Sequence, residues 1–171
     1  MRVNSIDNDQ TNFQAKLQLS KSLKTPRWNN IAKEFESQTT NAPDFLVRLT
    51  KEGRCNGMLI SICKENDKKN FLLSYALKLS GTDKLMNLDD SSIIQKLMKL
   101  LNIAKENDKL LNNLPKDIQN LEQEYGVKFT HEEASFISSN IKCKAWRKLE
   151  SIIKEDDILS KYISFAYPCK K

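Results

Sequence analysis

His131 is the only histidine in this 171-residue chain, so any mechanism that needs an imidazole must use it. Thr130 and Glu133 flank it in the pattern of a capping box, which places His131 in the first turn of a helix. A zinc-binding His-Glu-x-x-His helix would need a second histidine where the chain has Ser135. We therefore interpret His131 as an exposed helix-start residue, with a role as catalytic base as the alternative.

The four cysteines, Cys55, Cys63, Cys143 and Cys169, do not have the spacing of a metal site, because no two form Cys-x-x-Cys. Cys143 lies between two lysines, which would lower the pKa of its thiol and make it the candidate nucleophile of a small enzyme. The start of the chain shows no apolar secretory segment. We expect free thiols, a reducing compartment and a cytoplasmic location.

The chain has only four glycines, and they form neither a dinucleotide-binding loop nor a phosphate-binding loop. Together with the single histidine, this excludes most catalytic mechanisms that a sequence can reveal. We predict no catalytic, cofactor-binding or metal-binding residues, and an enzyme is the less favoured class. No run of about 18 apolar residues is present, so we predict no membrane span.

A cluster of basic residues is the candidate face for nucleic acid or an acidic partner. On a helix, Lys144, Arg147 and Lys148 lie on one polar side, whereas Trp146 turns toward the apolar side. The net charge of +6 is divided evenly between the two halves of the chain. An abundance of lysine, asparagine and isoleucine explains that charge as compositional bias, so a solvated helix face is the main interpretation.

Alternating apolar residues predict strands in the first half of the chain. Residues 1–10 are polar and expected to be disordered, and alternation over 13–19 predicts a first strand. Thr25 and Pro26 predict the start of a short helix. Three further alternating runs follow, and Asn56-Gly57 is typical of a tight hairpin. These runs, at 45–49, 58–63 and 71–79, predict a three-stranded antiparallel meander with the first strand at its edge.

Helical periodicity replaces the alternation after Gly81. It predicts about four helices: one capped by Asp90 or Ser91, one from Pro115 to a stop at Gly126, one over 131–154, and one from Asp157 to Phe165. The fold class is therefore α+β, an antiparallel sheet with a short helix followed by a group of helices. We predict a single domain over 11–168, with 81–90 as the candidate internal boundary.

Two resemblances accompany this prediction. The α-β-β-β-α order over 26–106 is similar to the double-stranded-RNA-binding domain, which implies phosphate binding by lysines at the start of the last helix. At that place this chain has Asp89, Asp90, Ser91 and Ser92, which cap a helix but repel phosphate. Separately, residues 10–17 resemble the start of small uncharacterised bacterial proteins, which implies a bacterial origin and no activity.

From these observations we predict a soluble protein that acts as a non-enzymatic protein–protein interaction module with an unknown protein partner. Its candidate surface is the outer face of the meander or the exposed side of the 131–154 helix. The first alternative is a weak, sequence-independent nucleic-acid binder that uses the basic helix face. The second is a small enzyme that depends on Cys143 or His131.

Overall fold

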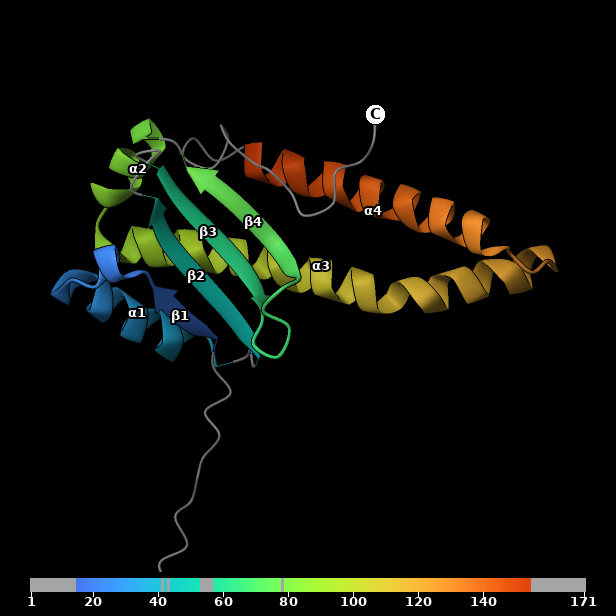
Figure 1. Cartoon of the computed structure of the whole chain (residues 1–171), viewed down its shortest axis with the longest axis horizontal. Helices are drawn as coiled ribbons and strands as arrows, with labels where there is room; N and C mark the ends of the chain where they lie inside the picture. The colour runs from blue at the N-terminus through green and yellow to red at the C-terminus, as the bar shows by residue number, and fades with distance from the viewer. Residues whose placement is uncertain (1–14, 41, 43, 53–56, 78, 155–171) are drawn as a thin grey trace, which may run out of the picture.

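The computed structural model describes residues 15–40, 42, 44–52, 57–77 and 79–154 (Figure 1). It is a mixed α+β structure, as predicted. The elements in chain order are β1 (Lys16–Leu19), the short 3-10 helix η1 (Lys21–Leu23), α1 (Pro26–Gln38), β2 (Phe45–Glu52), β3 (Gly57–Lys64), β4 (Phe71–Leu77), α2 (Leu79–Met86), α3 (Asp90–Tyr125) and α4 (His131–Lys154). The predicted disordered segment 1–10 and the predicted helix from Asp157 lie outside the described residues.

The four described strands form one sheet in the order β1-β2-β3-β4. β2, β3 and β4 pair antiparallel in succession, but β1 runs parallel to β2, so the prediction of a wholly antiparallel sheet is wrong. Parallel neighbours need a crossover connection, and the segment containing η1 and α1 supplies it. Alternation alone marks a strand without giving its direction.

One face of the sheet carries the core. Leu17, Val47, Ile62 and Leu73 are paired in register across the four strands and are all buried. α1 and α3 both contact the sheet and each other (Figure 1). Their apolar stripes complete the core with Trp28, Ile31 and Phe35 from α1 and with Ile93, Ile94, Leu97, Leu100, Leu101 and Ala104 from α3.

α3 is one helix of 36 residues, about 54 Å long at 1.5 Å per residue. The prediction that a separate helix begins at Pro115 is therefore wrong. Proline removes a backbone donor and disfavours helix at the preceding residue, but that residue, Leu114, is buried. We attribute the continuity of the helix to this packing, which outweighs the local cost of proline.

The chain between the sheet and α3 also differs from its prediction. Residues 81–90, the predicted boundary, include most of α2, and α2 begins at Leu79, where the predicted strand ended. Thr82 and Leu85, one helical turn apart, are both buried, and this spacing favours a helix. The cap of α3 is Asp89 rather than Asp90 or Ser91, because the Asp89 carboxylate accepts a hydrogen bond from the Ser92 amide at 2.8 Å.

Local rules correctly predict the turn between α3 and α4. Gly126 ends α3 with a left-handed φ of 65°, which glycine adopts without strain. The Thr130 amide donates to Glu133 Oε2 at 2.8 Å, and the Glu133 amide donates to Thr130 Oγ1 at 3.3 Å. This confirms the capping box. α4 then returns alongside α3, and the two form a helical hairpin that extends beyond the sheet (Figure 1).

Arg27 joins three helices at the base of this hairpin. Its Nε lies 2.7 Å from Asp90 Oδ1 in α3, and its guanidinium also donates to the Met86 carbonyl, the last of α2, and to the Leu88 carbonyl between α2 and α3. The last carbonyls of a helix, such as that of Met86, have no donor within the helix. Arg27 thus stabilises the end of α2 and the start of α3 together.

Replacing Arg27 with methionine should lower the free energy of unfolding by about 1–2 kcal/mol, the range for a few partly exposed hydrogen bonds. Urea denaturation followed by circular dichroism measures this change. Lys33→Met, an exposed substitution on the same helix, is the control and should have little effect. Equal losses for both variants would contradict the role assigned to Arg27.

The Asp89 cap predicts that the stability of the fold falls at acid pH. Hydrogen bonds from the Ser91 hydroxyl, and then from the Ser92 amide and hydroxyl, lower the pKa of Asp89 from 3.8 to about 2. A lowered folded-state pKa stabilises the protein above the unfolded-state value, and this stabilisation is lost as the pH falls toward 2. Asp89→Asn should flatten that part of the stability–pH profile measured by thermal denaturation, whereas Asp83→Asn should leave it unchanged.

Candidate functional site

The structure separates the residues considered for catalysis. His131 is the exposed first residue of α4. Cys143 is disulfide-bonded, so the prediction of a free, reactive thiol at this position is wrong. Cys63 is free but buried, and burial raises the pKa of its thiol. Among the described residues no cluster of three or more histidine, cysteine or acidic side chains could hold a metal ion.

The predicted basic face lies on α4. Lys144 and Arg147 are both exposed there, one helical turn apart. Lys148 belongs to the same helix, but its side chain lies outside what the structure describes. Binding to the phosphates of nucleic acid usually involves contacts with several cationic side chains. This face provides two described cations, one helical turn apart.

The outer face of the meander offers less surface than expected. Leu46, Ser61 and Cys63 belong to the face that alternates with the core, and each of the three is at most 6% exposed. Thr50 and Ala76 on the same face are exposed. This predicted docking surface is thus covered over much of its middle.

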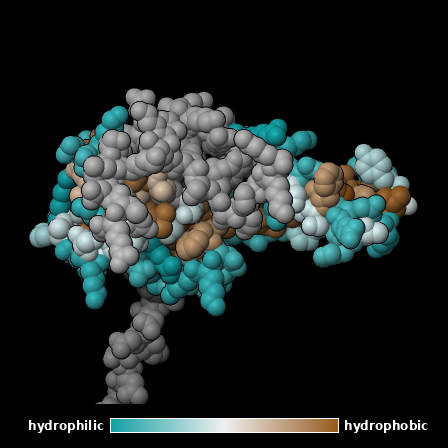
Figure 2. Space-filling view, turned by 45° about the horizontal axis from the view of Figure 1, so that its top comes forward, coloured by the Kyte–Doolittle hydropathy of each residue, from teal (hydrophilic) through white to brown (hydrophobic). Residues whose placement is uncertain are grey.

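A different surface is exposed at the far end of the α3–α4 hairpin. The exposed large apolar side chains among the described residues are Tyr125, Val127 and Phe136, which are 67%, 47% and 69% exposed. All three lie within about ten residues of the turn at Gly126. Hydrophobic side chains are visible at this end in Figure 2. We call residues 115–140 the hairpin tip.

The hairpin tip contains an apolar recess. Phe129, Phe136 and Ile137 form its apolar lining, Glu132 and Glu133 lie beside them, and its volume is about 360 Å³. Glu133 is held by Thr130, whose amide and hydroxyl lower the pKa of its carboxyl. Glu132 is exposed at the same helix start. The recess therefore combines an aromatic surface with an accessible negative charge.

The charge of the hairpin tip is opposite to that of the chain. Residues 115–140 contain five carboxylates and two lysines, whereas the whole chain has a net charge of +6. Compositional bias toward lysine cannot produce a local excess of acid. The tip is consequently an apolar surface with an acidic rim, and both features need an explanation.

The exposed side of the 131–154 helix was one of the two predicted surfaces, but the residues of the hairpin tip were not identified, although the sequence contains one indication of them. On a helical wheel the apolar stripe of α4 passes through Ala134 and Ile141, and Phe136 lies almost opposite to it. An aromatic residue outside this stripe does not contribute to the packing of α4 against α3. Its exposure could therefore have been anticipated, but the recess beside it depends on how the chain turns after Gly126.

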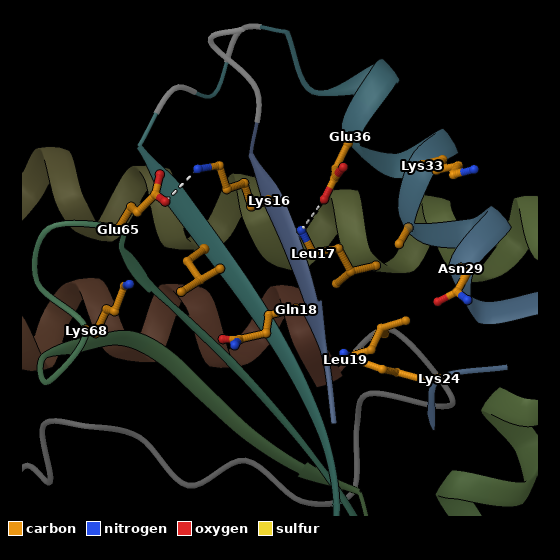
Figure 3. Close-up of a pocket in the computed structure, with 12 residues that line it drawn as sticks. Lys16, Leu17, Gln18, Leu19, Lys24, Asn29, Lys33, Glu36, Glu65 and Lys68 are labelled. Carbon is orange, nitrogen blue, oxygen red and sulfur yellow. Dashed lines mark hydrogen bonds and ion pairs between the residues drawn. The ribbon is translucent and has the colours of Figure 1, made fainter. Parts of the chain in front are cut away.

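A second hollow lies between β1 and α1, at the edge of the sheet (Figure 3). It has a volume of about 650 Å³ and is lined by charged side chains from both elements. Periodicity does not reveal it, because it is formed by the parallel placement of β1.

No family model, curated protein or solved structure matches this chain. Within the described residues, no helix is both long and apolar enough to cross a membrane. The cytoplasmic location predicted from the sequence stays a prediction.

Proposed function

We propose that this protein is a non-enzymatic protein-interaction module that binds a basic, apolar-faced helix of a partner protein at its hairpin tip. The observation that carries this proposal is the exposure of Phe136 beside the recess formed with Phe129 and Ile137. Large aromatic side chains are the usual anchors of protein interfaces, and exposing one costs free energy in the unbound protein.

The packing of the hairpin supports a helical partner. Phe129 and Ile137, which line the recess beside Phe136, are only half-buried. An amphipathic helix laid across the recess would cover the apolar surface that these residues and Phe136 leave exposed. The interaction would thus add the apolar contact that the hairpin alone does not make.

The acidic rim supports a basic partner. Lysine or arginine on the partner helix would meet Glu132 and Glu124, which are both exposed. The aliphatic part of such a side chain can lie on an aromatic ring while its charge reaches a carboxylate. An acidic or phosphate-bearing partner would be repelled at the same place.

Nucleic-acid binding through Lys144, Arg147 and Lys148 is the second candidate. The exposure of Lys144 and Arg147 on one side of α4 favours it, while the acidic tip on the same helix opposes it. It predicts affinity for an oligonucleotide that falls steeply with salt and is lost when the three charges are reversed.

The first proposal is tested with a fluorescently labelled amphipathic helical peptide that has leucines on one face and lysines on the other. We expect the full chain to bind it, and Phe136→Ser to weaken binding about tenfold, as for an aromatic anchor. Asn102→Ser, an exposed change on α3 outside the hairpin tip, is the control. Fluorescence anisotropy measures the affinities.

Charge reversal gives a second test of the same site. Glu132→Lys should weaken binding of the basic peptide, and Glu106→Lys, an exposed reversal on α3 outside the tip, should not. Peptide binding that is insensitive to both Phe136→Ser and Glu132→Lys would exclude the tip as the interaction surface. A labelled oligonucleotide in the same assay tests the nucleic-acid alternative.

A further inference from the structure

The outer edge of β1 carries main-chain groups that face away from the sheet. The Ser20 amide donates to the Leu49 carbonyl at 2.9 Å, so Ser20 faces β2. The Leu17 amide instead donates to Glu36 Oε1 at 2.9 Å, and the Ala15 carbonyl accepts from Thr39 Oγ1 at 3.3 Å. Main-chain groups alternate in direction along a strand, so Leu19 faces outward as Leu17 does.

These groups line the hollow between β1 and α1, which we call the edge groove. Its two walls are the residues of β1 and the side of α1 that carries Asn29, Ala32, Lys33 and Glu36 (Figure 3). Glu36 reaches across this groove to the Leu17 amide. An edge strand beside an open groove is the geometry in which an extended peptide adds a strand to a sheet.

The charges of the edge groove favour an acidic ligand. Four lysines and two glutamates line it, and both glutamates are engaged: Glu65 lies 2.6 Å from Lys16 Nζ, and Glu36 accepts from the Leu17 amide. Lys24, Lys33 and Lys68 are exposed and have no ion pair within the described residues. Their positive charges are therefore available to a ligand.

The positions of these lysines favour an extended ligand over a compact anion. In Figure 3, Lys68 lies on one side of β1, whereas Lys24 and Lys33 lie on the other, toward α1. Lys24 and Lys33 lie apart along the groove and do not converge on one point, as phosphate recognition would require. An acidic chain that follows the outer edge of β1 would meet these two lysines in turn.

We propose that the edge groove binds an extended acidic peptide, which pairs with the outer edge of β1 as an additional strand. The peptide replaces the Glu36 carboxylate as acceptor of the Leu17 amide and pairs with the main chain of Leu19, while its acidic side chains meet Lys24 and Lys33. Glu36 thus occupies the strand edge in the unbound protein and competes with the peptide. This site is independent of the hairpin tip.

The test uses the full-length protein and a short labelled peptide that alternates glutamate with valine. We expect saturable binding by fluorescence anisotropy. Lys24→Glu combined with Lys33→Glu should weaken it about tenfold or more, because two attractive charges become repulsive. Lys109→Glu combined with Lys116→Glu makes the same change in net charge at exposed positions of α3 and is the matched control.

Glu36→Ala tests the proposed competition at the strand edge, and amide exchange distinguishes strand addition from general attraction. It removes a competing acceptor and a negative charge, so the peptide should bind more tightly, and the variant's thermal denaturation shows that it is folded. In the bound protein the Leu17 and Leu19 amides should exchange more slowly with solvent, measured by NMR.

Three results would overturn the proposal: no binding of the acidic peptide, equal weakening by both double variants, or bound peptide without protection of Leu17 and Leu19. Equal affinity for a single-stranded oligonucleotide would indicate a general polyanion site and would also overturn it. Sedimentation could also show a dimer of this protein that dissociates when the peptide is added. That result would identify a second copy of the chain as the occupant of the groove and would also overturn the proposal.

Discussion

The whole structure depends on burial of the first half of α3 against the sheet. Ile93, Leu97 and Leu100 are at most 1% exposed, and each contributes about 1.5–3 kcal/mol when fully buried. Asp89 fixes where this helix begins, and Arg27 ties that beginning to α1 and α2. With its first half held in the core, the second half can extend past the sheet as a well-supported arm.

The extension of α3 past the sheet also requires that the helix continue through Pro115. If the helix ended there, the hairpin tip would take its direction from a loop rather than from the core. Two contacts on the sheet side help to fix the middle of α3. Lys64 Nζ lies 2.7 Å from Asp108 Oδ2, and the Asn107 side chain donates to the Leu72 carbonyl at 2.8 Å. The direction of the arm is thus set before the proline is reached.

Features governed by neighbouring residues could be predicted from the sequence, and features governed by distant contacts could not. The alternation of Phe45, Val47 and Leu49 predicts a strand whatever surrounds it, and the Thr130 capping box predicts a helix start in the same way. The parallel direction of β1 and the burial of Leu114 depend on tertiary packing. The recess at the hairpin tip and the edge groove both depend on such tertiary features, so the sequence could indicate the exposure of Phe136 but neither hollow.

The opposite charges of the two sites raise the question of whether the tip of one copy could enter the edge groove of another. Such contacts would join unlike surfaces and could form open chains of molecules. The backbone at the tip argues against it. Its acidic residues Glu124 and Glu132 lie on helices, whose backbone is coiled and cannot pair as a strand, whereas Leu17 and Leu19 would accept only an extended strand. Charge would attract the two surfaces, but on the two proposals the different backbone geometries would keep their partners distinct.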